Sequence, residues 1–211
     1  MKTGSGRILL VRHGQTRANV ELIWHGITDT PLTEQGRRQA SLAGSYINDH
    51  YSPISKVYAS QLQRARHTAE AIAGHAGLTV ESDVRLQEVD NGDWEDVSYA
   101  DLHQKHDYWR STMGEEDYRA PGGESRREVT QRMLASLSEI ADRHPEETVT
   151  VVSHGLAMAM VLSHLSGSES SDWSSFDTHN TGITILNSAD LSVIEFNITA
   201  HLGDVINQES K

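Results

Sequence analysis

The chain has 211 residues, no cysteine and a formal net charge of -12 at pH 7. This length suits one α/β domain with a substantial core. The lack of cysteine excludes disulfides, thiolate zinc sites and a cysteine nucleophile. The acidic balance argues against a general nucleic-acid surface, and no window approaches the ~18 apolar residues of a membrane span. We therefore expect a soluble, cytoplasmic protein with neither nucleic acid nor a membrane as a partner.

The chain carries 12 histidines, a number that could suggest a metal protein. They are scattered, and they show neither an H-E-x-x-H motif nor a repeated ligand spacing. We expect most of them on the surface, and we predict neither a metal site nor a cofactor. An anionic substrate would need a locally positive pocket in this acidic chain.

The clearest functional pattern lies near the N-terminus, where the apolar run Ile8 to Val11 is followed by Arg12-His13-Gly14. The run predicts a buried strand of a parallel sheet, and in open α/β sheets ligands bind beyond the carboxyl ends of the strands. Arginine offers a fork of donors that suits phosphate, and histidine is a nucleophile usable near neutral pH. The pattern indicates phosphoryl chemistry, although a chance surface turn would explain these residues alone equally well.

The next segment, Asn19 to Asp29, is expected to be a loop. Thr33, which follows a proline and a leucine, has the character of a helix N-cap. After it, Ala40, Ala43 and Ile47 recur at helical spacing. They predict a helix that packs on the sheet.

A second strand is predicted at Lys56 to Ala59, followed by Ser60 as the cap of a helix that extends to about Ala73. Arg64 then falls in the first turn of this helix. If the two strands are parallel, that turn lies at the same edge of the sheet as His13.

The middle of the chain is less regular. Short extended segments are expected at residues 79–81 and 84–86, just before Glu88. Residues 99–123 combine aromatic and charged side chains, Trp109 among them, without a clear period. We expect this stretch to be a small cap or lid insertion, with a solvated excursion as the alternative.

The last third begins with an apolar stripe over residues 125–143 that is typical of an amphipathic helix. Thr148 to Val152 has the β-branched pattern of a buried parallel strand. Ser153-His154-Gly155 follows that strand at once and repeats the layout of the first strand. An apolar helix is expected next, over residues 156–165.

A serine-rich loop at residues 166–175 and a hairpin of residues 182–186 with 191–198 complete the chain. We find no internal repeat or linker, so residues 1–211 are predicted to form a single domain. Strands that alternate with helices predict an α/β fold with a doubly wound, mostly parallel sheet flanked by helices.

Two strands that end in Arg-His-Gly and Ser-His-Gly bring two histidines to one edge of the sheet, where Arg64 can join them. In this combination the chain resembles the histidine phosphatase superfamily, with its phosphoglycerate mutase-like fold, over nearly its whole length. Eight ordered segments carry the resemblance. They are Leu10-Val11-Arg12-His13-Gly14-Gln15-Thr16 with Asn19, Asp29-Thr30-Pro31-Leu32-Thr33, Ser60-Gln61-Leu62-Gln63-Arg64-Ala65 with Thr68-Ala69, Leu86-Gln87-Glu88, Gly92-Asp93-Trp94-Glu95, Gly122-Gly123-Glu124-Ser125, Val152-Ser153-His154-Gly155 and Asn197-Ile198-Thr199-Ala200-His201-Leu202.

The resemblance implies that His13 is the nucleophile that takes the phosphoryl group as a phosphohistidine. It also implies that Arg12, Arg64 and His154 hold the phosphate oxygens. Two arginines and a second histidine can stabilise charge on the equatorial oxygens without magnesium. We therefore expect catalysis without a metal ion.

Four further positions take roles from the resemblance. Asn19 and the backbone of Gly155 would donate to the same phosphate, and Gln15 stands where relatives carry either Glu or Gln. Glu88 matches the general acid that protonates the leaving oxygen and later accepts a proton from the attacking water, a role that needs a partly buried carboxyl. Asp96 departs from the pattern, because relatives often have glycine at this position. We expect the aspartate to reshape the turn near Glu88.

The resemblance thus implies a phosphatase that hydrolyses a phosphomonoester of a small metabolite. A phosphoglycerate mutase, which returns the phosphoryl group to a second hydroxyl, is the first alternative. Family mutases carry several basic residues in the segment equivalent to residues 99–123, whereas here only Lys105, Arg110 and Arg119 are basic and acids outnumber them. An inactive phosphate-binding scaffold is the second alternative, and the retention of all five core residues argues against it. A monomer and a homodimer are both compatible with the sequence.

Overall fold

The computed structural model describes residues 6–105, 115–167 and 173–203. Six strands form its central sheet: β1 (Arg7–Arg12), β3 (Ile54–Ala59), β4 (Val80–Ser82), β6 (Thr148–Ser153), β7 (Ile183–Asn187) and β8 (Val193–Ile198). Their order in space is β4-β3-β6-β1-β7-β8. The first four of that order pair in parallel, and β7 and β8 join through antiparallel pairing. The predicted doubly wound, mostly parallel sheet is confirmed.

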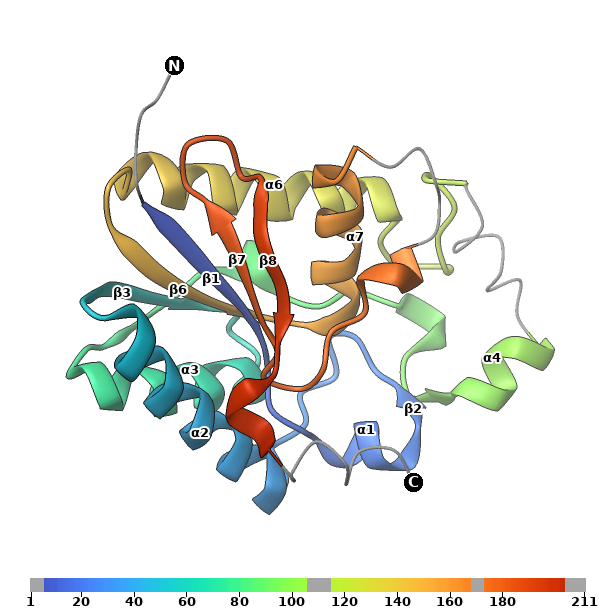
Figure 1. Cartoon of the computed structure of the whole chain (residues 1–211). Coiled ribbons are helices and arrows are strands. Elements are labelled where there is room, and N and C mark those ends of the chain that lie inside the picture. The colour runs from blue at the N-terminus through green and yellow to red at the C-terminus, as the bar shows by residue number, and fades with distance from the viewer. Residues whose placement is uncertain (1–5, 106–114, 168–172, 204–211) are drawn as a thin grey trace.

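Helices cover both faces of this sheet (Figure 1). One layer consists of α2 (Glu34–Tyr51) and α3 (Gln63–Ala76), and the other of α6 (Arg126–Arg143) and α7 (Gly155–Leu165). Successive side chains of a strand point to opposite faces of the sheet, so the apolar residues of β1 pack alternately against the two helix layers. Ile8 and Leu10 belong to the core with α6 and α7, and Leu9 and Val11 to the core with α2 and α3. This two-sided burial explains the continuous apolar run in the sequence.

The starts of α2 and α3 depend on side-chain caps. Thr33 caps α2 as expected, because its hydroxyl accepts a hydrogen bond from a backbone N–H of the first turn. The expected cap of α3 by Ser60 is wrong, since that helix begins only at Gln63 and the Ser60 hydroxyl accepts from the Leu62 N–H. Instead, the Asp29 carboxylate accepts from the Gln63 N–H at 2.8 Å. A segment that is distant in sequence therefore caps α3.

Residues 19–29, expected as a loop, include regular structure. They overlap the short helix α1 (Arg17–Glu21) and contain β2 (Ile23–Trp24). A helix of five residues is too short to show an apolar period. Residues 84–86 likewise form a 3-10 helix, η1 (Val84–Leu86), rather than an extended segment.

Residues 99–123 contain more regular structure than expected. They begin with α4 (Tyr99–Lys105), directly after β5 (Val97–Ser98), which pairs with β2 in a separate small sheet. A third apolar cluster joins this region to the rest, with Trp24, Trp94, Leu102 and Ala120 as its buried members. The described start of the segment is therefore packed rather than solvated. Its function as a cap or lid stays a prediction, and Trp109 lies outside the described residues.

The C-terminal hairpin is confirmed, although β8 begins at Val193 rather than at Leu191. Leu191 has a φ of 58°, a left-handed conformation that places it in the turn. Two further 3-10 helices are η2 (Gly92–Trp94) and η3 (Trp173–Phe176), the latter in the stretch expected as a serine-rich loop. None of the helices in the described residues combines the length and the apolar character that a membrane span requires.

Candidate active site

The two histidine motifs meet at one edge of the sheet. β1 and β6 pair in parallel with Arg12 opposite Ser153, so the residues that follow the two strands become neighbours. The ring centroids of His13 and His154 lie 5.1 Å apart. Arg64, in the first turn of α3, donates from Nε to His154 Nδ1 at 3.2 Å. The structure thus brings together side chains from three separate motifs.

A cavity of about 290 Å³ opens beside these residues. This volume lies near the lower end of the range for ligand pockets and suits a small metabolite. Arg64 and His154 are fully buried and are not among the residues that line the cavity; the ring of His154 lies 5.1 Å from that of His13, and Arg64 donates to His154. Five of the predicted site residues line it: Arg12, His13, Asn19, Glu88 and Gly155. The remaining lining residues are Ile23, Trp24, His25, Asn91, Tyr99, Leu156, Trp173, Ser174 and Asp177.

His13 is held as a neutral ring with its lone pair on Nε2. Its Nδ1 lies 2.7 Å from the carbonyl oxygen of Gly14, and because a carbonyl only accepts, Nδ1 carries the proton. Burial, together with repulsion from the charges of Arg64 and Arg12, holds the pKa of His13 well below its usual 6.5. A neutral imidazole with an available lone pair is the form that a nucleophile requires.

His154 has the complementary arrangement of protons. Its Nδ1 accepts the hydrogen bond from Arg64, so in the neutral ring the proton sits on Nε2. Burial and the charge of Arg64 lower the pKa of His154 well below 6.5. Within the described chain, this buried Nε2 has no hydrogen-bond partner. An unsatisfied buried donor calls for an explanation, and a phosphate oxygen beside His13 would supply one.

Arg64 is a buried cation fixed by the backbone. Its Nη1 donates to the Thr28 carbonyl at 2.8 Å, and its Nη2 donates to the Gly26 carbonyl at 2.5 Å. Burial lowers its pKa to about 10, against the opposing effect of Glu88. The guanidinium therefore stays charged at neutral pH and adds positive potential to the site.

Arg12 is oriented by a different set of partners. Its Nη1 donates to the Thr178 carbonyl, and also to the Asp177 carboxylate at 3.2 Å. A Cβ on Gly155 would lie 3.0 Å from the guanidinium carbon of Arg12, so the glycine lets this side chain pack on the start of α7. The Nε of Arg12 is buried and lacks a partner among residues 6–105, 115–167 and 173–203. It is a second donor available to an anion in the cavity.

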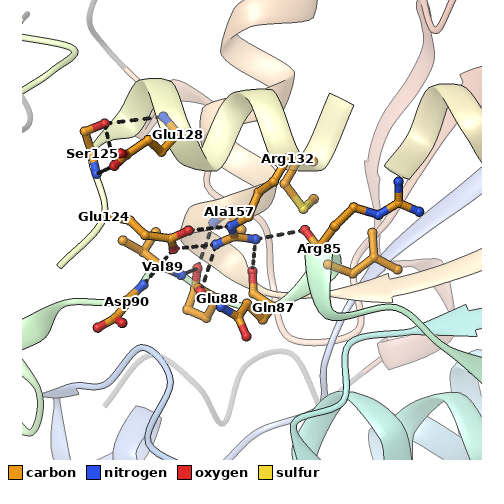
Figure 2. A network of polar contacts seen from close by, with 12 residues as sticks. Arg85, Gln87, Glu88, Val89, Asp90, Glu124, Ser125, Glu128, Arg132 and Ala157 are labelled. Carbon is orange, nitrogen blue, oxygen red and sulfur yellow. Dashed lines mark hydrogen bonds and ion pairs between the residues drawn. The ribbon is translucent and has the colours of Figure 1, made fainter. Parts of the chain in front are cut away.

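Glu88 lines the cavity and is fixed there by three backbone N–H groups. Figure 2 labels two of these donors, Val89 and Ala157. Its Oε1 accepts from Val89 at 3.0 Å and from Ala157 at 2.8 Å, and its Oε2 accepts from Leu156 at 3.1 Å. The N-cap of α7, His154, makes no side-chain capping bond, so the Glu88 carboxyl serves the first turn of that helix instead.

The two amide side chains near β1 take different positions. The Oδ1 of Asn19 accepts from the Thr16 N–H at 3.0 Å and from the Asn180 amide at 3.4 Å. Since that oxygen is engaged, the amide nitrogen of Asn19 is the group suited to a phosphate. The Oε1 of Gln15 accepts from the Thr33 hydroxyl at 2.9 Å, and Gln15 is not part of the described cavity lining. Its role in substrate binding stays a prediction.

Glu95 and Asp96 shape the turn that borders the site. Burial opposes ionisation of Glu95, but backbone N–H donors from residues 26, 27 and 28 and from Asn91 outweigh it and lower its pKa. Asp96 has a φ of 59°, in the left-handed region that glycine adopts most easily. Its carboxylate accepts from the Thr28 hydroxyl at 3.1 Å. These two acids therefore hold the loop over residues 26–28.

His25 is a cavity residue that the sequence did not indicate. Its Nδ1 donates to the Ile23 carbonyl at 3.3 Å, and burial lowers its pKa to about 4, so the ring is neutral at pH 7. No described residue contacts its buried Nε2 through a hydrogen bond, which leaves an acceptor at the cavity. Tyr99 and Asp177 were missed as well, because they reach the cavity from segments that carry no motif of their own.

The positive charge of the site comes from Arg12 and Arg64. Among the residues whose placement is described, no group of three or more His, Cys, Asp or Glu side chains could hold a metal ion. Catalysis without a metal stays a prediction, and it requires that these two cations and the donor of His154 suffice for the phosphate.

The buried histidines predict a fall in stability at acid pH. Unfolded histidine titrates near pH 6.5, whereas His13 and His154 have lower pKa values in the folded state. Above pH 6.5 neither state takes up a proton. Below it, only the unfolded state does, so the free energy of unfolding should drop by about 1.4 kcal/mol per histidine for each pH unit. Urea unfolding at pH 7.5, 6.5 and 5.5 measures this loss.

The matched control for this measurement is His154→Asn, which removes one of the histidines whose pKa is lowered in the folded state, the others being His13, His25 and His201. Its free energy of unfolding should fall less steeply between pH 6.5 and 5.5 than that of the wild type. Identical slopes in the two proteins would show that His154 does not stay neutral when the chain folds.

The fold and the site together define an α/β protein with two histidines and two arginines at the carboxyl edge of its sheet. The model of the histidine phosphatase superfamily (branch 1) matches residues 8–193. The chain therefore belongs to the histidine phosphatase superfamily, as its motifs indicated.

Sequence relatives include a protein from Klebsiella pneumoniae named probable phosphoglycerate mutase GpmB. It is 36% identical over 163 residues, which cover 76% of this chain and 75% of the relative. Among solved structures, Bacillus stearothermophilus YhfR has a TM-score of 0.84 at 29% identity and covers 94% of this chain and 100% of its own. Phosphoserine phosphatase from Entamoeba histolytica, in complex with 3-phosphoglyceric acid, has a TM-score of 0.83 at 27% identity, with 93% and 99% covered. The chain is thus similar both to proteins named as mutases and to proteins named as phosphatases.

Proposed function

We propose that this chain is a metal-independent phosphatase that hydrolyses a phosphomonoester of a small metabolite through a phosphohistidine on His13. The observation that carries the proposal is the state of the His13 ring. A hydrogen bond from Nδ1 to the Gly14 carbonyl and a lowered pKa leave a neutral ring with a lone pair on Nε2. This ring lines a cavity together with Arg12 and Glu88.

The first step forms a phosphoenzyme. Nε2 of His13 bonds to phosphorus as the ester P–O bond breaks, and the Glu88 carboxyl gives its proton to the departing alkoxide. Charge on the equatorial oxygens is met by Arg12, by Arg64 and by the Nε2–H of His154.

The second step regenerates the enzyme. Water attacks phosphorus, Glu88 takes a proton from that water, and the P–N bond to His13 breaks. Inorganic phosphate leaves, His13 is again neutral and Glu88 again carries the proton that the next substrate needs. No external reductant or metal enters this cycle.

The lining of the cavity supports a neutral alcohol as the leaving group. Trp24, Tyr99 and Trp173 offer aromatic surface for the carbon skeleton of the substrate. Asp177 contributes a carboxylate beside Arg12, and a second anionic group on the substrate would be repelled by it. We expect the partner to be a small phosphorylated metabolite of the cytoplasm, with no nucleic acid or membrane involved.

A phosphoglycerate mutase is the second candidate, because a relative with 36% identity carries that name. A mutase would retain the phosphoryl group and return it to a second hydroxyl of the substrate. Arg119 is one of the basic residues in the segment 99–123. Its guanidinium already forms an ion pair with Glu128, at 2.8 Å. This pairing favours hydrolysis over a grip on a second anion.

The test is a panel of phosphorylated metabolites assayed for phosphate release in the presence of EDTA. A phosphatase should release inorganic phosphate from at least one alkyl phosphate, at the same rate with and without the chelator. The products of 3-phosphoglycerate are analysed in parallel. Formation of 2-phosphoglycerate without phosphate release would support the mutase, and a rate that EDTA abolishes and magnesium or zinc restores would contradict metal-independent chemistry.

A further inference from the structure

The guanidinium of Arg132, on α6, makes five hydrogen bonds beside Glu88 (Figure 2). Three of them go to backbone carbonyls and two to the side chain of Glu124. Its Nε and Nη2 donate to the two carboxylate oxygens of Glu124, each at 2.8 Å. Its Nη1 donates to the carbonyls of Arg85 at 2.9 Å and Gln87 at 2.7 Å. Its Nη2 also donates to the carbonyl of Glu88 at 2.9 Å. Each of the five N–H groups of an arginine thus has an acceptor.

Glu124 extends this hold to the other side of Glu88. Its Oε2 accepts from the Asp90 N–H at 3.0 Å, and its own N–H donates to the Asp90 carbonyl at 2.8 Å. The backbone is therefore bound at Gln87 and at Glu88 itself by Arg132, and at Asp90, two residues after Glu88, by Glu124. The side chains of Arg132 and Glu124 are only 15% and 23% exposed, so water weakens their ion pair less than it weakens a surface pair.

The helix that carries Arg132 is itself firmly placed. Val129 and Met133 of α6 are fully buried in the core beneath it. At its N-terminus, the hydroxyl of Ser125 accepts from the Glu128 N–H, and the Glu128 carboxylate accepts from the Ser125 N–H at 2.9 Å. Glu124 directly precedes this capping box, which fixes its backbone relative to the helix.

We propose that Arg132 and Glu124 are positioning residues for protonation of the leaving group. They fix the backbone of Glu88 so that its carboxyl stays at the cavity wall, and they do so without lining the cavity themselves. This proposal rests on the proposed function, in which Glu88 is the acid. A displacement of about 1 Å can cost on the order of 10²-fold in rate, so the position of this backbone matters for the reaction.

Arg132→Lys is the informative change, because lysine keeps the charge but presents three donors on one nitrogen instead of a planar fork. We expect the rate of His13 phosphorylation by glycerol phosphate to fall by about 10²-fold. With p-nitrophenyl phosphate, whose leaving group needs no proton, the fall should be less than about tenfold. Both rates come from single-turnover rapid-quench measurements. Their ratio does not depend on the fraction of folded enzyme, so a merely structural role would leave it unchanged.

The matched control is Arg143→Lys, the same exchange on the same helix. Arg143 makes an exposed ion pair with Glu139, and its loss should leave both rates unchanged. Glu124→Gln is a second variant that keeps the shape of the side chain and removes its charge. It should shift the ratio in the same direction as Arg132→Lys by a smaller factor, and it carries the test alone if Arg132→Lys does not fold.

Glu88→Gln separates this proposal from the proposed function. If Glu88→Gln lowers the rate more for glycerol phosphate than for p-nitrophenyl phosphate, but Arg132→Lys and Glu124→Gln keep the wild-type ratio, the positioning role is overturned and the acid stands. If Glu88→Gln itself leaves the ratio unchanged, the role of Glu88 as the acid is contradicted, and with it the positioning role of Arg132 and Glu124. Support requires a shifted ratio in Glu88→Gln and in at least one of the other two variants.

Discussion

His13→Ala should lose turnover by on the order of 10⁶-fold, as expected when the covalent nucleophile of an enzyme is removed. The reason is that Nε2 of His13 carries the lone pair that attacks phosphorus, since Nδ1 is committed to the Gly14 carbonyl. The first measurement is the steady-state rate with p-nitrophenyl phosphate. The second is covalent labelling with a phosphate donor, quenched in alkali because phosphohistidine is acid labile.

The control is His75→Ala, an exchange at an exposed histidine in the last turn of α3. This variant should keep both the turnover and the acid-labile label of the wild type. Equal labelling of His13→Ala and the wild type would place the phosphoryl group on another residue, and His154 would be the first to examine because its ring lies 5.1 Å away.

The core of the site was predictable because its residues come after segments whose apolar pattern identifies them as strands. His13 and His154 come directly after apolar strands, and parallel pairing of β1 with β6 is sufficient to bring them together. Arg64 lies in the first turn of α3, the helix that follows the next strand of the sheet, β3. Side chains at the ends of adjacent parallel strands meet whatever the details of the loops, so periodicity and strand ends locate them.

The supporting contacts were not predictable, because they join segments whose distance in sequence carries no signal. The Asp29 carboxylate caps α3 at Gln63, 34 residues away. Arg132 reaches the Gln87 carbonyl across 45 residues, and no pattern at either end indicates the other. The local residues at these sites are ordinary for a turn or a helix surface, and only the folded chain shows that they are partners.

The short helix α1 and the short strand β2 were not predicted, for a different reason. A helix as short as α1 contains little more than one turn, so its sequence has no apolar period to detect. His25 lies just after β2 in that same stretch and reaches the cavity without any motif around it. Cavity walls built from short elements are therefore the part of this site that sequence patterns miss.

Glu88→Gln should slow phosphorylation of His13 far more with an alkyl phosphate than with p-nitrophenyl phosphate. General acid catalysis contributes about 10²- to 10⁴-fold, and its benefit is greatest when the leaving alkoxide is a poor one. A nitrophenolate leaves without a proton. We therefore expect a loss in this range with glycerol phosphate and a much smaller loss with the nitrophenyl ester.

The substitution is suited to this test because glutamine can preserve most of the local contacts. Its amide oxygen can take the place of Oε1, which accepts from Val89 and Ala157, while its NH₂ group faces the Leu156 N–H where Oε2 accepted. One of three backbone hydrogen bonds is lost and the Leu156 N–H is left without an acceptor, at a cost of about 1–3 kcal/mol in stability. A circular dichroism melt checks that the variant remains folded at the assay temperature.

The other acids of the matched motifs are poor candidates for the same role. The Glu95 carboxylate is bound by the backbone of residues 26–28, and the Glu124 carboxylate is bound by Arg132. Neither is part of the described lining of the cavity, whereas Glu88 is. A leaving-group effect in Glu88→Gln can therefore be assigned to this carboxyl rather than to a neighbour.

The step that is measured decides whether the experiment is informative. In the proposed cycle Glu88 also takes a proton from water during hydrolysis of the phosphoenzyme, when the leaving group has already departed. That second step should slow by the same factor for both substrates, so steady-state rates would hide the difference whenever it limits turnover. Single-turnover phosphorylation rates isolate the first step. If Glu88→Gln lowers these rates equally for the alkyl and the nitrophenyl ester, Glu88 does not protonate the leaving group.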